Sequence, residues 1–246
     1  MEPLSPRLQA IVDLIGNGAS MADIGSDHAR LPLYLLQNGR ISRAIATELR
    51  DGPFRRTLAA VERCHLRQQI DVRQGDGLQT LAAGEVDVVV IAGLGGDSIA
   101  AILSHDWSKA ERFPRYVFQP MTKADVLRKT LAARGWPILE EKLLLDNGRY
   151  VVILVSQPDC TPYPLDEMEA EFGTEILQAD DEIKRAYLFH FMQKYNKIYA
   201  SLDKSARQDK EHWAKTCWER IQRLEMILDA SYRPGNQQNN GSPLPD

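Results

Sequence analysis

Short apolar runs alternate with amphipathic stretches over the first part of the chain. The run at residues 86–92 is apolar without alternation, as expected for a strand that is covered on both faces. Amphipathic stretches with helical spacing of the apolar positions separate these runs, and this order predicts a parallel sheet with helices on both sides. The predicted strands are 20–25, 43–48, 70–73, 86–92 and 116–119, and the predicted helices are 4–16, 31–37, 53–65 and 123–134.

The predicted sheet closes with an antiparallel hairpin. Residues 136–144 and 150–155 flank Asp146-Asn147-Gly148, which is a strong signal for a tight hairpin turn. β-α units followed by such a hairpin are typical of the class I methyltransferase fold, a Rossmann-like α/β architecture. A dehydrogenase domain does not normally end in this way.

Composition changes at residues 158–164, a proline-rich segment that we interpret as a linker after a domain at 1–157. Residues 165–230 contain no proline and place apolar side chains three or four positions apart, which predicts an antiparallel helical hairpin, or coiled coil. Trp213 and Trp218 fit the seam of this hairpin better than a base-stacking surface. Residues 231–246 are rich in Pro, Gly, Asn and Gln and predict a disordered tail.

Composition indicates an ordinary globular protein. The 246 residues are 43% hydrophobic and 26% charged, and no apolar run approaches the roughly 20 residues of a membrane span. Cys64, Cys160 and Cys217 are few and widely separated, so we expect reduced thiols in a cytoplasmic protein and neither disulfides nor a metal site. We further expect a monomer or a weak homodimer that does not bind membranes.

Charge leaves the question of an RNA partner open. A net charge of −4 argues weakly against a nucleic-acid partner. Phosphates are bound by local basic patches, however, and not by the net charge of the whole protein. Five arginines are spaced along the predicted helix after the second strand and just beyond its ends, and they form either a phosphate-binding face or a merely solvated one. They are Arg50, Arg55, Arg56, Arg63 and Arg67.

The loop after the first predicted strand is the most informative segment of the chain. It reads Asp23-Ile24-Gly25-Ser26-Asp27-His28, and the fingerprint G-x-G-x-x-G of dinucleotide-binding proteins is absent. The carboxylates of Asp23 and Asp27 would repel a diphosphate and attract a ligand with ammonium and sulfonium charges. The loop therefore favours S-adenosylmethionine over NAD.

Three further segments fall at the ends of successive predicted strands, where a doubly wound sheet binds its ligand. Glu48 closes the second strand 23 positions after Gly25, close to the roughly 20 positions expected of an acid that holds ribose hydroxyls. Asp76 lies between two glycines, where its carboxylate could accept a hydrogen bond from the adenine amine. Residues 92–96 form a glycine-rich loop after the fourth strand. The predicted cofactor-binding residues are Asp23, Gly25, Ser26, His28, Glu48, Asp76, Gly77, Ala92 and Gly93.

These segments, together with Leu31-Pro32, residues 52–54, Gln119-Pro120 and Gly135-Trp136, resemble the bacterial tRNA (adenine(22)-N1)-methyltransferase family. The resemblance runs from about residue 4 to 156 and more loosely through the helical extension. It implies S-adenosylmethionine as methyl donor and N1 of an adenine in the D-arm of tRNA as acceptor. Two positions depart from the family pattern: Leu94 stands where methionine is usual, and Arg30 stands where an aromatic residue is common.

Asp27 is the predicted catalytic residue. Adenine N1 carries an in-plane lone pair, so the site must mainly align it with the methyl group, and a carboxylate would favour the cationic product. Two other roles for Asp27 are open, namely capping the helix that starts near Leu31 or binding the cofactor amine, and His28 could serve a structural hydrogen bond as well as a ligand. The expected substrate-binding residues are Arg30, Gly95, Gly96, Gln119 and Pro120.

Two other functions fit the same residues: methylation of another RNA or of a small molecule, and cofactor binding without catalysis by an RNA-binding module. Basic side chains along the predicted hairpin could grip the tRNA body, although acidic residues are interspersed among them. These basic residues are Lys184, Arg185, Lys194, Lys197, Lys204, Arg207 and Lys210.

Overall fold

The structure, a computed structural model, describes residues 3–159, 161–202 and 209–230. The chain divides into two compact units, of which the first ends at Ala179 and the second begins at Asp180. The first unit contains the sheet.

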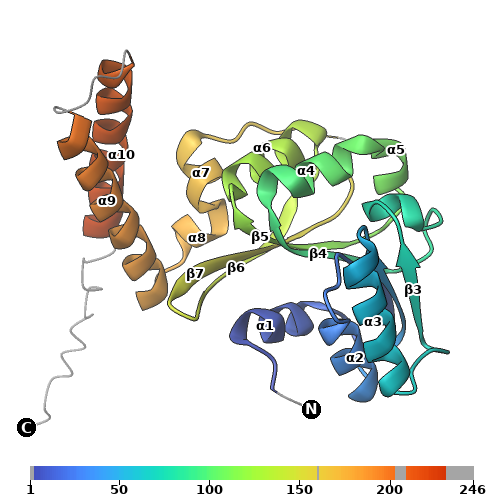
Figure 1. Cartoon of the computed structure of the whole chain (residues 1–246). Coiled ribbons are helices and arrows are strands. Elements are labelled where there is room, and N and C mark those ends of the chain that lie inside the picture. The colour runs from blue at the N-terminus through green and yellow to red at the C-terminus, as the bar shows by residue number, and fades with distance from the viewer. Residues whose placement is uncertain (1–2, 160, 203–208, 231–246) are drawn as a thin grey trace, which may run out of the picture. The chain divides into compact units, whose positions relative to one another are not determined.

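A mixed seven-stranded sheet forms the centre of the first unit, with the strand order β3-β2-β1-β4-β5-β7-β6 (Figure 1). The first five strands are parallel, and β7 runs antiparallel to both of its neighbours, β5 and β6. The strands are β1 Ala19–Ile24, β2 Ile41–Glu48, β3 Ile70–Gln74, β4 Val88–Gly95, β5 Tyr116–Thr122, β6 Ile138–Asp146 and β7 Arg149–Ser156. The predicted α/β fold with a closing hairpin is confirmed.

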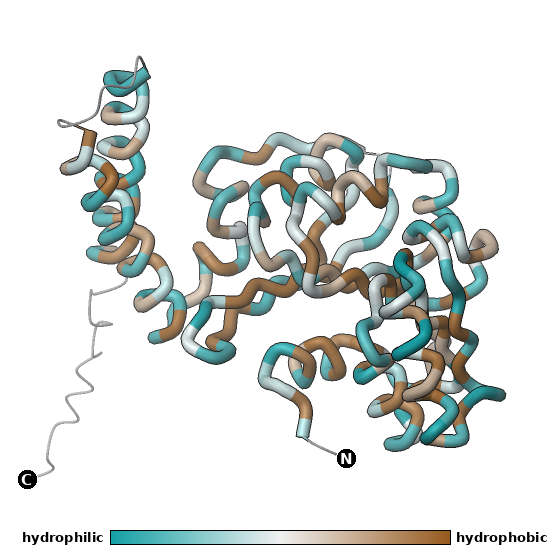
Figure 2. The backbone as a smooth tube through the Cα atoms, in the orientation of Figure 1, coloured by the Kyte–Doolittle hydropathy of each residue, from teal (hydrophilic) through white to brown (hydrophobic). Residues whose placement is uncertain are grey.

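Helices cover both faces of the sheet (Figure 1). One face carries α1, α2 and α3, and the other carries α4 and α6; Figure 2 shows the apolar strands between these two layers. The bounds are α1 Pro6–Leu14, α2 Arg30–Gln37, α3 Asp51–Arg63, α4 Gly96–His105, α5 Trp107–Ala110 and α6 Ala124–Arg134, with a short 3-10 helix at Gly77–Thr80. Val89, Val90 and Ile91 of β4 are fully buried, which explains why that strand is apolar without alternation.

The turn of the closing hairpin matches its prediction. Asn147 and Gly148 have φ values of 49° and 75°, as the tight turn between β6 and β7 requires. The glycine-rich segment after the fourth strand differs from its prediction as a loop. Leu94 and Gly95 still pair with β5, because the chain makes a bulge at Gly93, where φ is 80°.

Two short helices follow the sheet within the first unit: α7 Glu167–Phe172 and α8 Thr174–Gln178. The helical segment predicted as one hairpin over 165–230 therefore begins with two helices that pack in the first unit. The break between them lies at Gly173, whose φ of 93° interrupts the helix. The unit boundary at 179/180 lies well beyond the predicted linker at 158–164.

The second unit contains two long helices, α9 Glu182–Leu202 and α10 Lys210–Ala230. Arg220 lies over the ring of Tyr195 at 5.4 Å, and the rings of Tyr199 and Trp218 are 6.3 Å apart. The residue numbers run in opposite directions along this contact, so the two helices are antiparallel. Trp218 is 52% exposed and therefore lies at the edge of the seam, whereas Cys217, Ile221 and Leu224 are buried.

Several expectations fall on residues that the structure does not describe. The tail predicted at 231–246, Cys160, and the basic residues Lys204 and Arg207 all lie outside the described ranges. Among the described helices, none combines the length and apolar composition that crossing a membrane demands.

Candidate active site

The candidate site lies at the carboxyl ends of the central parallel strands. β1 pairs with β2 on one side and with β4 on the other. The chain therefore moves outward from β1 to β3 and then returns to the opposite side of β1. Such a reversal opens a crevice beyond the strand ends, which is where ligands bind in open α/β sheets.

Asp23 lies near the end of β1 and is 5% exposed. In the described part of the chain its side chain accepts one hydrogen bond, from Ser26 Oγ to Oδ2 at 2.5 Å. The pKa of Asp23 is raised from 3.8 to about 6, mainly by burial and also by the charge of Glu48, while the hydrogen bond from Ser26 and the charge of Arg7 act in the opposite direction. A buried carboxylate with so few partners favours the approach of a cation.

The loop after β1 has an unusual backbone. Gly25 has a φ of 72°, and the next residues with positive φ are Asp27, His28 and Ala29, at 36°, 68° and 51°. Left-handed backbone costs about 1–2 kcal/mol per residue for side chains other than glycine. Such a loop persists only where its surroundings hold it, and strain of this kind concentrates at functional sites.

Glu48 and Thr57 hold this loop from the neighbouring β2 and α3. The backbone N–H of Asp27 donates to Glu48 Oε1 at 2.6 Å, and the N–H of His28 donates to Thr57 Oγ1 at 3.1 Å. Glu48 is 7% exposed, and burial is the main reason why its pKa is raised, with the charge of Asp27 adding to the effect. Asp23, Asp27 and Glu48 therefore form an acidic site that disfavours anionic ligands.

The side chains of Asp27 and His28 point into a more open region. The Asp27 side chain is 77% exposed and lies 3.6 Å from the His28 ring, measured from Oδ1 to Nε2. Ala29 occupies the N-cap position of α2, and no side chain caps that helix. The capping role considered for Asp27 is therefore excluded. Arg30 is exposed at the first residue of α2.

Asp76 and Gly77 lie beyond β3, on the side of the crevice where Glu48 stands. They line a cavity of about 200 Å³ together with residues of α4, namely Ala101, Ile102 and His105. Asp76 is exposed and Leu78, which also lines the cavity, is buried. This end of the site thus offers one carboxylate beside apolar side chains, a combination suited to a flat heterocycle with an amine.

Gly93, Gly95 and Gly96 are required at their positions for different structural reasons. The N–H of Gly93 donates to Gln119 Oε1 at 3.2 Å, so its backbone faces the end of β5. A Cβ on Gly96 would overlap the backbone carbonyl of Lys123, and a Cβ on Gly95 would meet Asp97 and Thr122. Gly96 is buried, so close packing of α4 against the end of β5 is sufficient to require glycine there.

Arg7 belongs to this site and was missed by the reading of the sequence. Its Nη1 donates to Gln119 Oε1 at 2.8 Å, and its Nε lies 3.9 Å from Asp146 Oδ2 in the hairpin between β6 and β7. Gln119 is buried, and its Nε2 donates to the carbonyl of Pro120 at 3.0 Å. No motif surrounds Arg7, and its only sequence signal is a cation on an amphipathic helix. That helix packs against β6 and β7, which are remote from it in sequence.

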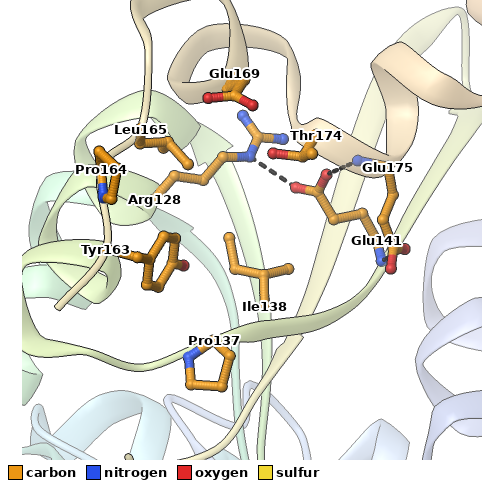
Figure 3. A pocket seen from close by; sticks show the side chains of 10 residues that line it. All are labelled: Arg128, Pro137, Ile138, Glu141, Tyr163, Pro164, Leu165, Glu169, Thr174 and Glu175. Carbon is orange, nitrogen blue, oxygen red and sulfur yellow. Dashed lines mark hydrogen bonds and ion pairs between the residues drawn. The ribbon is translucent and has the colours of Figure 1, made fainter. Parts of the chain in front are cut away.

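A second hollow, of about 420 Å³, lies between α6, β6 and the segment that leads into α7 (Figure 3). Its charged side chains are already paired: Arg128 Nε donates to Glu141 Oε1 at 2.7 Å, and Glu141 Oε2 accepts from the N–H of Glu175 at 3.3 Å. Arg128 also donates to the carbonyls of Ala170 and Glu171, each at 2.9 Å. This cluster fastens α7 and α8 to the sheet and is distinct from the crevice at the strand ends.

No group of histidine, cysteine and acidic side chains suited to a metal ion is present among the residues that the structure describes. The crevice presents carboxylates, amides, a guanidinium and backbone groups.

The methyltransferase domain family matches residues 4–154 of the chain. The chain is 43% identical over 154 residues to the tRNA (adenine(22)-N(1))-methyltransferase of Bacillus subtilis, a match that covers 63% of this chain and 65% of that enzyme. The sequence match thus spans slightly less than two thirds of the length of this relative.

Solved structures resemble the chain over most of its length. The crystal structure of the B. subtilis m1A22 tRNA methyltransferase TrmK has a TM-score of 0.83 and 31% identity, and the match covers 93% of this chain and all (100%) of that one. A candidate tRNA (m1A22) methyltransferase of Streptococcus pneumoniae, solved in complex with S-adenosyl-L-methionine, has a TM-score of 0.77 and 30% identity. The match covers 92% of this chain and 100% of that one.

Proposed function

The chain belongs to the bacterial tRNA (adenine(22)-N1)-methyltransferase family, and from this premise we propose that it transfers a methyl group from S-adenosylmethionine to N1 of an adenine, at position 22 in the D-arm of tRNA. The observation that carries the proposal is the pair of buried carboxylates, Asp23 and Glu48, at the reversal point of the sheet. Because tRNA is the proposed partner, we also propose that the protein acts in the cytoplasm.

The residues of the crevice fit S-adenosylmethionine. Glu48 closes β2 and accepts the ribose hydroxyls, while Asp76 accepts from the adenine amine on the same side. Asp23 stands on the other side of Glu48 and attracts the positive charges of the methionine part. Gly25 and Gly93 leave space for the ligand at the strand ends, because neither carries a side chain.

The cofactor, when bound, supplies a methyl group on a positively charged sulfur. Adenine N1 forms the new bond with its in-plane lone pair while the bond between methyl carbon and sulfur breaks, and the positive charge passes to the adenine. The nucleophile exists without a base, so the chain's residues must orient N1, exclude water and favour the developing charge.

Asp27 is the proposed catalytic residue for this step. Its carboxylate is exposed on the strained loop, where it can face the acceptor base. The hydrogen bond from its backbone N–H to Glu48 fixes its backbone. A negative charge beside the developing cation, or a hydrogen bond from the adenine N6 amine, lowers the barrier. His28, Arg30, Gln119 and Pro120 are proposed to position the base.

The target adenine must leave its stack to enter this crevice, at a cost of a few kcal/mol. Exposed arginines near the opening, Arg50 and Arg56 among them, offer favourable charge for the RNA backbone. Basic side chains on α9 and α10 are a second proposed contact region, and we propose a monomer or weak homodimer.

The test uses purified full-length protein, S-adenosylmethionine with a labelled methyl group, and a tRNA transcript that carries A22. Methylation at N1 blocks the pairing edge of adenine, so reverse transcription should stop at position 22. A matched transcript with A22 replaced by G is the control and should accept no label. Label in the control at an equal rate, or label only in ribosomal RNA or metabolite extracts, would overturn the proposed substrate. Cofactor binding without transfer to any of these acceptors would favour a non-catalytic binding module.

A further inference from the structure

We propose that Arg73 is a positioning residue of the proposed enzyme: together with Glu85 it holds the segment 76–80, so that Asp76 can accept a hydrogen bond from the adenine amine of the cofactor. This inference rests on the proposed function, because Asp76 has that role only if S-adenosylmethionine is the ligand. Arg73 acts through the protein and not by contact with the ligand.

The segment 76–80 forms one side of the cavity of about 200 Å³ beyond β3. Residues 76–79 line this side, and residues of α4 line the other. The two sides approach closely, since a Cβ on Gly77 would lie 3.0 Å from Cγ2 of Ile102. Asp76 is exposed at the start of the segment. A small displacement of the segment therefore changes both the width of the cavity and the place of the Asp76 carboxylate.

Thr80 is the residue that fixes the turn around Asp76. It ends the 3-10 helix Gly77–Thr80, a single turn whose own hydrogen bonds have poor geometry. Its Oγ1 donates to the carbonyl of Gly77 at 3.0 Å, and its Cγ2 lies 2.5 Å from the position that a Cβ of Gly75 would take. Thr80 thus contacts the chain on both sides of Asp76.

Arg73 holds Thr80 from β3. Its Nη1 donates to the carbonyl of Thr80 at 2.8 Å and to Glu85 Oε2 at the same distance, and its Nη2 donates to Glu85 Oε1 at 2.6 Å. Glu85 Oε2 also accepts from the N–H of Ala82 at 2.8 Å. Two parallel hydrogen bonds fix the orientation of a planar guanidinium. The pair therefore holds the end of the 3-10 helix and the chain just beyond it.

The pair of Arg73 and Glu85 is partly shielded from solvent, with side chains that are 26% and 21% exposed. The hydrogen bonds from Arg73 are the main reason why the pKa of Glu85 is lowered to about 2, so the pair stays charged near neutral pH. Asp71 also accepts from Arg73, from Nε at 2.8 Å, but its side chain is 58% exposed. Because Asp71 lies on β3 itself, its bond does not connect Arg73 to the segment 76–80.

A merely structural role of Arg73 gives a different expectation. Its loss would then destabilise the first unit and lower the affinity for every ligand alike. A positioning role acts on one hydrogen bond, the one from the adenine amine to Asp76. It is therefore visible in the comparison of two ligands that differ in that amine alone.

The experiment measures binding by calorimetry in the absence of RNA. The ligands are S-adenosylhomocysteine and its 6-deamino analogue, in which hydrogen replaces the adenine amine. Wild type should bind the first about 10- to 100-fold more tightly, as expected for one hydrogen bond to a charged acceptor. Arg73→Met should bind the two ligands within about threefold of each other. Arg73→Lys should retain a part of the preference, because an ammonium keeps the charge without the planar fork.

Asp71→Asn is the matched control, since it removes a partner of Arg73 that does not lead to the segment 76–80. It should keep the preference for S-adenosylhomocysteine within about threefold of the wild-type value. Asp76→Ala removes the acceptor itself and should abolish the preference. Thermal unfolding of each variant shows whether the fold is retained, and Arg73→Lys carries the test if Arg73→Met does not fold.

A preference that stays at the wild-type level in folded Arg73→Met or Arg73→Lys would overturn the inference, even if both ligands bind more weakly, because Arg73 would then have a structural role. Equal binding of the two ligands by wild type, or an undiminished preference in Asp76→Ala, would show that Asp76 does not accept from the amine and would overturn it as well. These results would leave the proposed methyl transfer in place. Failure of wild type to bind S-adenosylhomocysteine at all would contradict the proposed function itself.

Discussion

The backbone N–H of Asp27 donates to the carboxylate of Glu48, with 2.6 Å between N and Oε1. The proposed catalytic residue and the proposed ribose-binding acid are thus joined directly. Any change of Glu48 that shifts its carboxylate also shifts the loop that presents Asp27. Binding and catalysis are therefore expected to respond together to changes of Glu48, and separately to changes of the Asp27 side chain.

Asp27→Asn should separate the two. Asparagine keeps the shape, tolerates the positive φ and retains the backbone bond to Glu48, but it removes the negative charge. We expect kcat to fall by about 10²-fold, whereas the affinity for S-adenosylhomocysteine stays within about threefold. Single-turnover methylation and calorimetry on the same preparation measure both quantities. Unchanged turnover would remove Asp27 from the mechanism.

Cofactor affinity should depend on pH through Asp23. Its pKa in the free protein is about 6, mainly because it is buried, and the ionised form attracts the cationic cofactor. The dissociation constant should therefore rise as the pH falls below about 6, by up to tenfold per pH unit. Calorimetry between pH 5 and 8 measures this dependence on wild type and on Asp23→Asn. A variant that shows the same pH dependence as wild type would show that another group is responsible.

The same pKa sets the effect of Asp23 on stability. The folded protein holds the proton more tightly than the unfolded chain, so the contribution of Asp23 is most favourable below pH 3.8 and is lost as the pH rises through about 6. Asp23→Asn should accordingly stabilise the ligand-free protein at pH 7.5, by at most about 3 kcal/mol, while weakening cofactor binding. Urea unfolding at that pH gives the difference. A destabilised variant would contradict the raised pKa.

Gly96→Ala should destabilise the first unit. The added methyl group would overlap the backbone carbonyl of Lys123, which cannot move as a flexible side chain can. We expect a loss of about 1–3 kcal/mol. Gly16→Ala is the matched control, because a Cβ there meets no atom within 4 Å, and it should change stability by less than about 0.5 kcal/mol. Equal melting temperatures for the two variants would refute the proposed packing role.

Arg128→Met should be far more damaging than Lys129→Met, although the two residues are neighbours on α6. Arg128 pairs with Glu141, and both side chains are 1% exposed, so the variant leaves a buried carboxylate without its counter-charge. The expected loss is about 3–5 kcal/mol. Lys129 pairs with Glu167 at the surface, and its loss should cost less than about 1 kcal/mol. Denaturant titration of both variants decides, and similar losses would contradict the argument.

Periodicity and turn residues were enough to predict the five parallel strands, the helices α1, α2, α3 and α6, and the closing hairpin, whereas α4 and α5 between β4 and β5 were not among the predicted helices. Asp23, Gly25 and Glu48 could be located because strand ends in a parallel sheet converge on one edge. The continuation of β4 through Leu94 was not predictable, because it depends on pairing with β5, a contact between distant segments. Arg7 was missed for the same reason, since its partners Gln119 and Asp146 are brought to it only by the fold.

The segment after the hairpin shows a different limit. Residues 167–178 have helical spacing, so sequence joined them to the long helices that follow. Their place in the first unit depends on Arg128, whose guanidinium donates to the carbonyls of Ala170 and Glu171 at the end of α7. A surface-type residue such as arginine gives no sequence signal that it will be buried in this role.

The buried Arg128 also sets the length of chain that can fold by itself. The family match ends at residue 154, but the carbonyls that satisfy this guanidinium come from residues 170 and 171. A protein trimmed to the matched segment would keep the ion pair of Arg128 with Glu141 but would lose the carbonyls of Ala170 and Glu171, which accept hydrogen bonds from the guanidinium. Truncation at Ala179 keeps these carbonyls, so we expect the smallest segment that folds by itself to include α7 and α8, beyond the end of the family match.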